Sequence, residues 1–274
     1  MVGGLLDPDD CSTTTPPDAK TQVHFGDICV TDKSVNWEAK KASWNQQCDG
    51  APNVCTLPTE FFGPEAFFLY GPSIFYSDPS VSTELLAEIL SYSVDQEPPE
   101  EMVEYDSYYW SNVSYTTGLD YTAPLGPPTI YGPDVCLEVD GQFFYSGHPW
   151  EVVAREYAAM TLKEATGMNY TRHDVIAAAA MEAVAWMPVV QKFNTVSGLP
   201  PIPYATVRAS SNHLAGAVAK TSDGTWLDAG HFEEDFGLGY GYAIRTGSML
   251  VLEMLKGRCL AKKPAKKCDC DYKL

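Results

Sequence analysis

The stretch that decides the fold is Met181-Glu182-Ala183-Val184-Ala185, which is followed along the chain by Ala205-Thr206-Val207-Arg208-Ala209-Ser210-Ser211-Asn212. The first places a carboxylate at the head of an apolar run. The second is typical of a buried strand that ends abruptly in small polar residues. Because ligands of α/β proteins bind beyond the carboxyl ends of the strands, the two stretches together predict a ligand site at that edge of a sheet.

Composition narrows the class of protein. The chain has 274 residues, of which 45% are hydrophobic, enough for one large α/β domain or two smaller ones. Its formal net charge of -18 argues against a nucleic-acid partner, because phosphates would be repelled. No apolar run is long enough to cross a bilayer, and Met1 is not followed by a signal-peptide pattern, so we expect no membrane span.

The cysteines and two glycosylation sequons indicate the cellular compartment in which the protein folds. The chain has eight cysteines without a CxxC pair, and neither they nor the scattered histidines have the spacing of a metal site or a Ser-His-Asp triad. Disulfides are the better interpretation, with Cys48 and Cys55 the best candidates for a local bridge across a Pro/Gly/Asn-rich loop. Asn112 and Asn169 each begin an N-glycosylation sequon. We therefore expect a secreted or luminal protein.

Periodicity and turn residues predict the elements. We expect three strands: 22–30 around a Gly-Asp turn, 135–145 as a strand or hairpin, and 204–210 in the second stretch. We also expect three helices, at 78–97, 149–167 and 243–255. Alternating strands and helices favour a mainly parallel sheet covered on both sides. Residues 97–134 have no clear period and predict a loop-rich insertion, while Pro188 is expected to limit any continuous helix through the apolar run.

The chain divides into a domain over 1–257 and a basic, cysteine-containing tail over 258–274. A basic tail on an acidic body can be a solvated terminus, or it can bridge to a neighbouring copy. We expect a homo-oligomer.

Five short motifs occur in order between Val2 and Asn212: Gly-Gly-Leu, Gly-Asp-Ile-x-Val, an aromatic Phe-Phe strand with its helix, Met-Glu-Ala-x-Ala, and Val-Arg-Ala-x-Ser-Asn. Their order resembles the nucleoside phosphorylase superfamily, and within it the nucleosidases and the plant bark storage proteins. The resemblance implies a three-layer α/β/α fold with a central mixed, mainly parallel sheet that binds a purine nucleoside at the strand ends. It implies no cofactor, with phosphate as a possible co-substrate.

The resemblance assigns the ribose to the Met-Glu pair. Glu182 would accept hydrogen bonds from two ribose hydroxyls while Met181 packs on the sugar, and a single carboxylate can bind vicinal hydroxyls in this way. The alternative interpretation is that Glu182 is a carboxylate placed at a helix start, where the helix dipole favours it.

The resemblance also assigns residues to the base. Phe144, or Phe143 beside it, falls where an aromatic side chain stacks on the purine, and Val2 with Gly3 matches a glycine turn whose backbone approaches base and sugar. An aromatic residue in a strand is more often simply part of the core.

Asn212 stands where the nucleosidases have an aspartate that protonates the departing purine. An amide can hydrogen-bond the purine edge, but it cannot act as a general acid. Asn also suits a turn or helix cap. Arg208 is most simply a structural partner for a carboxylate.

The resemblance implies that strands before the glycine turn supply a nucleophile-activating group, whereas the sequence as given starts at this turn. We expect that residues are missing from the given sequence, that a separate chain completes the sheet, or that catalysis has been abandoned. Two functions therefore stay open. The chain binds a purine nucleoside and, if active, cleaves its N-glycosidic bond; alternatively, it is an inactive secreted storage or structural glycoprotein on the same fold, assembled through its Cys-rich tail.

Overall fold

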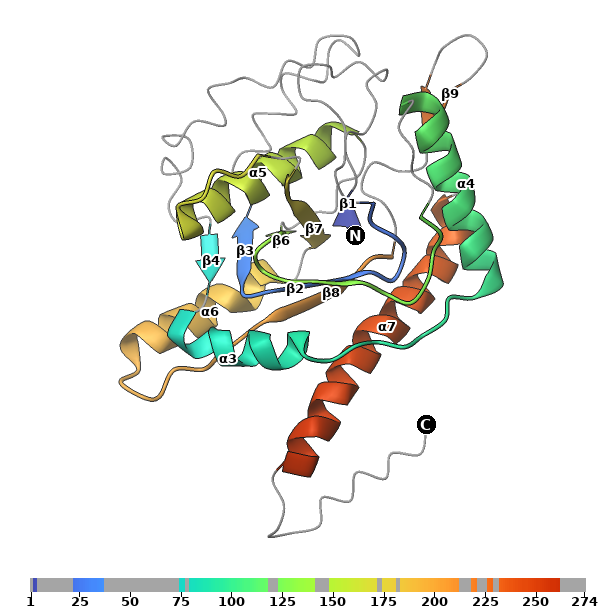
Figure 1. Cartoon of the computed structure of the whole chain (residues 1–274). Helices are drawn as coiled ribbons and strands as arrows, with labels where there is room; N and C mark the ends of the chain where they lie inside the picture. The colour runs from blue at the N-terminus through green and yellow to red at the C-terminus, as the bar shows by residue number, and fades with distance from the viewer. Residues whose placement is uncertain are drawn as a thin grey trace.

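The computed structural model has an α/β fold in which helices surround the strands (Figure 1). The residues that it describes are 2–3, 22–36, 74–76, 79–117, 123–140, 148–171, 174–180, 183–211, 218–220, 226–228 and 232–261. The predicted fold class, a mixed and largely parallel α/β arrangement, is confirmed.

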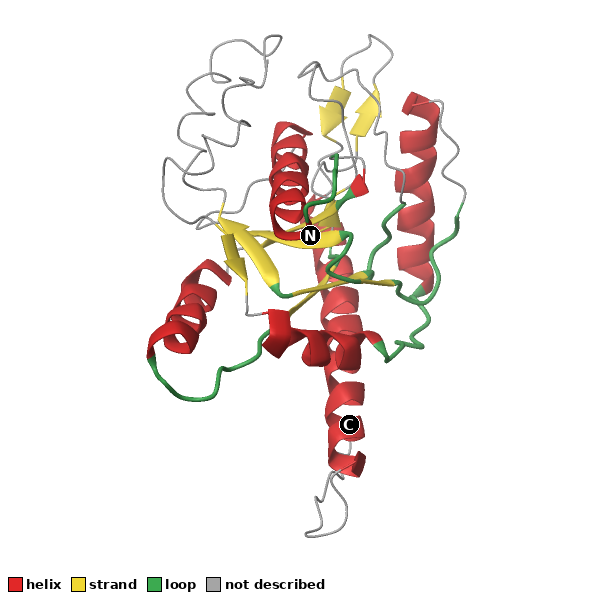
Figure 2. Cartoon of the chain, turned by 60° about the vertical axis from the view of Figure 1, so that its left-hand side comes forward, coloured by secondary structure: helices red, strands yellow, loops and turns green. Residues whose placement is uncertain are grey.

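The larger sheet has five strands in the order β1-β7-β6-β3-β4, seen in yellow in Figure 2. Their bounds are Val2–Gly3, Ile176–Ala180, Cys136–Asp140, Lys33–Asn36 and Ile74–Tyr76. The three central strands β7, β6 and β3 run parallel, whereas β1 and β4 pair antiparallel at the two edges. All five residues of β6 are buried, as expected for a parallel strand covered on both faces.

A second sheet has three strands in the order β5-β2-β8, with bounds Ile130–Tyr131, Ile28–Thr31 and Thr206–Ala209. Only Asp32 separates β2 from β3, so the chain passes from one sheet to the other within a single residue. β9 (Val218–Lys220) and β10 (Trp226–Asp228) form a separate antiparallel pair. The strands of the described part therefore lie in three sheets rather than in one central sheet.

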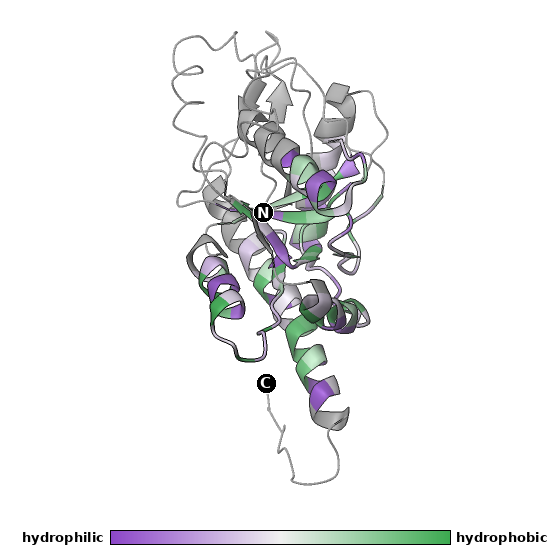
Figure 3. Cartoon of the chain, turned by 90° about the vertical axis from the view of Figure 1, so that its left-hand side faces the viewer, coloured by the Kyte–Doolittle hydropathy of each residue, from purple (hydrophilic) through white to green (hydrophobic). Residues whose placement is uncertain are grey.

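Within the described ranges, five helices cover the strands. They are α3 (Pro79–Leu90), α4 (Glu100–Thr117), α5 (His148–Thr166), α6 (Ala183–Val196) and α7 (Phe232–Ala261). α5 packs against β6 and β7, α6 against β3 and β4, and α3 and α7 against β2 and β8. In Figure 1 α5 lies above the strands and α3 below them, and Figure 3 shows hydrophobic residues along the strands between the helices.

Two helices begin within one residue of the expected positions, because α3 starts at Pro79 and α5 at His148. The expected end of the first helix at 97 is wrong, because α3 ends at Leu90. Pro79 is the first residue of α3, where its missing N–H costs no hydrogen bond. α5 ends before Gly167, which has a φ of 72° and donates its N–H to the carbonyl of Lys163 at 2.8 Å. A glycine in the left-handed region at this position is a common helix C-cap.

The expected loop over 97–134 is wrong in its first half, because residues 100–117 form α4. Met102, Asp106 and Trp110 are buried at spacings of four residues, on one face of the helix. A carboxylate in the middle of that face removes the apolar periodicity by which such a helix is recognised.

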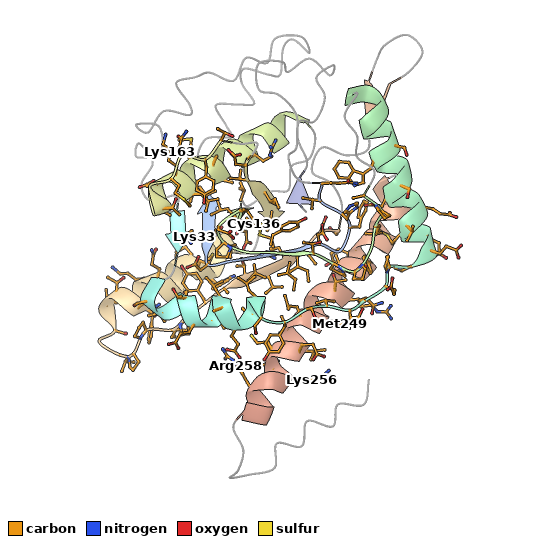
Figure 4. All side chains as sticks on the ribbon, in the orientation of Figure 1. Lys33, Cys136, Lys163, Met249, Lys256 and Arg258 are labelled. Atoms are coloured by element: carbon orange, nitrogen blue, oxygen red, sulfur yellow. A yellow bond between two sulfur atoms is a disulfide. The ribbon has the colours of Figure 1, made fainter. Side chains whose placement is uncertain are left out.

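The final helix is longer than expected, because α7 continues through Gly257 to Ala261, four residues into the predicted tail. Gly257 packs closely against Tyr92: a Cβ on it would lie 1.8 Å from the hydroxyl oxygen, so the Tyr92 side chain would have to move. Arg258, labelled in Figure 4, then donates three hydrogen bonds to Glu88 of α3, two from Nε at 2.7 and 2.9 Å and one from a terminal nitrogen at 2.6 Å. Residues 262–274 lie outside the described residues.

The expected limit at Pro188 is also wrong, because this residue lies inside α6. An interior proline costs about 3 kcal/mol, here the loss of the hydrogen bond to the Val184 carbonyl. Packing offsets the cost. Met187 is fully buried against Tyr204, and the ring of Trp186 meets Tyr204 edge-on at 5.4 Å.

The expectation of disulfides is met by a bond that the sequence did not predict. Cys29 of β2 is bonded to Cys136 of β6, and both are fully buried in the region where Figure 4 labels Cys136. This disulfide joins the two larger sheets. The predicted pair Cys48 and Cys55 lies outside the described residues. Within the described ranges, no helix is long and apolar enough to cross a membrane.

Candidate functional site

Two of the predicted site segments leave the sheet side by side. β6 and β7 are parallel neighbours, and their last residues, Asp140 and Ala180, are paired. The chain continues from Asp140 toward Phe143 and Phe144, and from Ala180 directly into Met181 and Glu182. These four side chains lie outside the described residues. The two segments that carry them therefore start from one sheet edge, at the carboxyl ends of adjacent strands.

The glycine turn begins beside the same strand. β1 pairs antiparallel with β7, with Val2 opposite Ala178 and Gly3 opposite Ala177. The backbone of Val2 and Gly3 is thus hydrogen-bonded to the strand that leads into Met181 and Glu182.

The third segment follows β8. Ser210 exchanges two backbone hydrogen bonds with the turn before β2: the N–H of Gly26 donates to its carbonyl, and its N–H donates to the carbonyl of Asp27, each at 2.8 Å. α7 covers the next residue, because a Cβ on Gly239 would lie 2.2 Å from the carbonyl oxygen of Ser211. Asn212 comes immediately afterwards and lies outside the described residues.

The turn that holds Ser210 needs a glycine. Gly26 has a φ of 82°, which side-chain-bearing residues rarely adopt, and a Cβ on it would lie 2.3 Å from Cε1 of Tyr242. Tyr242 of α7 packs against this turn and donates its hydroxyl to the carbonyl of Gln96 at 3.2 Å.

A buried group of ionisable side chains surrounds the same turn. Nδ1 of His24 lies 2.6 Å from Oδ2 of Asp106 on α4, and Asp106 is only 1% exposed. The carboxylate of Asp27 accepts hydrogen bonds from the backbone N–H of His24 and of Thr129, both at 2.8 Å. The ring of Trp110, one turn further along α4, meets the His24 ring edge-on at 6.1 Å.

The surroundings shift the pKa values of this group. Burial raises the pKa of Asp27 from 3.8 to about 6, although the backbone hydrogen bonds from His24 and Thr129 oppose the rise. Burial alone would lower the pKa of His24, but the hydrogen bond and charge of Asp106, with the charge of Asp27, outweigh it and raise the pKa above its ordinary value of 6.5. Tyr131 and Tyr242 lie near Asp27, and burial raises the pKa of both hydroxyls.

Arg208 has the structural role predicted for it. Its Nε donates to Oε1 of Glu138 at 2.8 Å, and its terminal NH2 contacts the same oxygen. Glu138 is fully buried on β6, so this ion pair joins β8 of the three-stranded sheet to β6 of the five-stranded sheet. The pair and the disulfide between Cys29 and Cys136 fix β8 relative to β6.

The two sequons differ in setting. Asn169 is exposed in the segment between α5 and β7, and Thr171 of its sequon is hydrogen-bonded to Asp174 at 2.6 Å. Asn112 lies within α4, and its side chain is not among those described.

Sequence reasoning missed His24 and Asp106. They are 82 positions apart, and no spacing rule connects a histidine before a turn with a carboxylate on a helix that was not predicted. The pairing depends on how α4 packs. Asp27 was part of a recognised Gly-Asp turn, but its burial was not foreseen. No group of three or more metal-ligating side chains occurs in the part of the chain that the structure describes.

The chain was compared with known proteins. No protein-family model matches the sequence, and no curated protein matches it. Among solved structures it is similar to the 5'-methylthioadenosine/S-adenosylhomocysteine nucleosidase of Borrelia burgdorferi B31 bound to adenine, with 15% identity and a TM-score of 0.37. It is also similar to the Neisseria meningitidis enzyme in complex with methylthio-immucillin-A, with 13% identity and a TM-score of 0.33.

A methylthioadenosine nucleosidase of Weissella paramesenteroides gives 14% identity and a TM-score of 0.37. In all three comparisons the match covers 93% of this chain and 66% of the other. The chain therefore spans just under two thirds of the length of these structures. At such low TM-scores, the function has to be inferred from this chain's own residues.

Proposed function

We propose that the chain binds a purine nucleoside beyond the carboxyl ends of β6 and β7. Glu182 would hold the ribose hydroxyls with Met181 against the sugar, and Phe143 or Phe144 would stack on the base. The observation that supports this most directly is the pairing of Asp140 with Ala180, from which both segments leave the sheet together. Two parallel strands that end at one edge form the usual location of a ligand in an α/β protein.

The base would lie toward Asn212, whose amide can hydrogen-bond a purine edge. Ser210 and Ser211 precede it, and the turn at Gly26 together with α7 fixes their backbone. A rigid backbone before a ligand-binding side chain reduces the entropy lost on binding. If the chain is catalytic, the reaction is cleavage of the N-glycosidic bond, with water or phosphate as the acceptor.

Calorimetry with adenosine, inosine and methylthioadenosine, each with and without phosphate, tests the binding. We expect at least one nucleoside to bind, and we expect Glu182→Gln to weaken it by about tenfold, the equivalent of one charge-assisted hydrogen bond. Glu164→Gln is a matched control, since Glu164 is exposed on α5. Absence of binding by all three nucleosides would leave the storage or structural alternative, and release of free base would add the catalytic activity.

We further propose that the protein folds in an oxidising compartment. The buried disulfide between Cys29 and Cys136 supports this, because cytosolic thiols are kept reduced. The exposed Asn169 is accessible for N-glycosylation there. Digestion of the natively produced protein with a peptide N-glycosidase should lower its mass, and Asn169→Gln should make that change smaller by one glycan. An unchanged mass would contradict glycosylation.

A further inference from the structure

One side of α7 exposes apolar side chains of a kind that a helix normally buries. Ile244 is 52% exposed and Leu255 is 47% exposed, whereas Tyr242, Thr246 and Leu250 on the other side of the helix are buried. In Figure 1 the last turns of α7 extend beyond α3. A row of exposed apolar residues on a helix is typical of a protein–protein contact.

The residues of this row are arranged symmetrically about Ser248. Gly241 and Leu255 lie seven residues before and after it, and Ile244 and Leu252 lie four residues before and after it. At 3.6 residues per turn, all five fall within about 40° of one line along the helix. Leu252 is partly exposed and the other four are exposed. We call these five residues the α7 row.

We propose that a second copy of the chain docks on the α7 row, with the two α7 helices antiparallel and a two-fold axis at Ser248. In a two-fold contact both copies use the same surface, so each residue meets the one that lies equally far from the axis. Leu255 then meets Gly241 of the second copy, and Ile244 meets its Leu252. This contact is independent of the purine nucleoside site.

The sizes of the side chains fit this pairing. A Cβ built on Gly241 would have nothing within 4 Å, so the surface of the helix is open at this point. The Leu255 side chain of the second copy can occupy that space. Ser248, which is also small, lies where the two helices cross, and small residues at a crossing allow the helix axes to approach to about 8 Å.

The charge of this part of α7 also favours a second copy. The formal net charge of the chain is -18, so two copies repel each other over most of their surfaces. Residues 240–261 carry three basic side chains and one acidic side chain, namely Arg245, Lys256, Arg258 and Glu253. Two copies can therefore approach through α7 with less repulsion than elsewhere.

The end of the chain is poorly suited to cover the row itself. Residues 262–274 follow α7 directly, but seven of these thirteen residues are charged. A charged segment gains little from burying an apolar row, because its own polar groups would lose water.

Sedimentation velocity at about 1 to 100 µM tests the contact. One helix face buries less than the roughly 800 Å² per partner of a standard interface, so we expect a dimer that dissociates at micromolar concentrations. Gly241→Glu should weaken it at least about tenfold, because the new side chain fills the space for Leu255. The variant should fold, since glutamate favours a helix more than glycine does. Val189→Glu on α6, where Val189 is 66% exposed, is the matched control and should leave the dimer unchanged.

Two further variants test the antiparallel arrangement. Gly241→Glu combined with Leu255→Lys should restore the dimer, because each new acid then lies beside a new base of the second copy. Ser248→Cys should give a disulfide-linked dimer on mild oxidation. Ile244→Cys should not, because its two copies would lie about 12 Å apart along the helices, whereas a disulfide spans about 7 Å at most. Both cysteine variants also carry Cys268→Ser and Cys270→Ser, which prevents cross-links through the tail.

The inference fails if the protein sediments as a monomer over the whole range of concentrations. It also fails if Gly241→Glu leaves a dimer unchanged, which would place the contact elsewhere. A dimer that is cross-linked through Ile244→Cys and not through Ser248→Cys would overturn the antiparallel pairing about Ser248.

Discussion

Replacing Cys29 and Cys136 together by alanine should destabilise the fold strongly. The two residues are 107 positions apart, and the disulfide restricts the unfolded chain over that whole loop. In the chain-entropy model a loop of this length contributes about 4.7 kcal/mol, while measured losses on removing a native disulfide are about 2 to 5 kcal/mol. Both sulfurs are fully buried between the two sheets, so the smaller alanines also leave a void. We therefore expect a loss near the upper end of that range.

Urea unfolding followed by circular dichroism, without reductant, measures the loss. Cys48→Ala with Cys55→Ala is the matched control, because a bridge between these neighbours would close a much shorter loop and contribute less. Alkylation of the unfolded, unreduced protein followed by peptide mapping locates the bond. The reasoning fails if Cys29 and Cys136 are both alkylated without reduction, or if the variant unfolds within about 0.5 kcal/mol of the wild type, the usual scatter of neutral substitutions.

Three further predictions concern the turn before β2 and the ion pair between β8 and β6. Gly26→Ala should lower the melting temperature and broaden the amide spectrum, because a Cβ there would meet the ring of Tyr242 at 2.3 Å and the φ of 82° disfavours alanine; an unchanged melting curve would contradict it. Arg208→Met should lower the free energy of unfolding by about 3 kcal/mol, because it leaves buried Glu138 without this partner. A double-mutant cycle with Glu138→Gln should show a coupling energy of at least about 1 kcal/mol, whereas additive losses would mean that the pair does not interact. The pKa of Asp27 is about 6 in the folded protein against an ordinary 3.8, so the contribution of Asp27 to the free energy of unfolding should fall by about 3 kcal/mol as pH rises from below 3.8 to above 6. Asp27→Asn should remove that part of the pH dependence. If the variant shows the same change in the free energy of unfolding between about pH 4 and pH 7 as the wild type, the prediction is wrong.

The elements that the sequence predicted are those with local causes. The cap at Gly167, the start of the helix near residue 78 and the strand within 204–210 each follow from a few neighbouring residues. The partner of Arg208 could be predicted only as a carboxylate, because its identity depends on β8 lying near β6. The purine-site residues stay predictions, since Glu182 and Asn212 lie outside the described residues.

The elements that were missed depend on contacts between distant segments. α7 continues through Gly257, which packs against Tyr92 of another segment, a contact that a local stretch of sequence does not show. α4 was missed because Asp106 occupies the centre of its buried face. A buried carboxylate costs several kcal/mol unless it is paired, so the helix can pack there only because His24 meets it.

That pairing limits what Asp106 and His24 can be exchanged for. A pair retained only for stability could be replaced by apolar residues of similar volume at little cost, and a buried ion pair is often no more stable than such a replacement. The double substitution His24→Leu with Asp106→Leu tests this by urea unfolding: a variant as stable as the wild type would show that the buried pair adds no net stability, whereas a loss of about 3 kcal/mol or more would show that the pair stabilises the packing of α4.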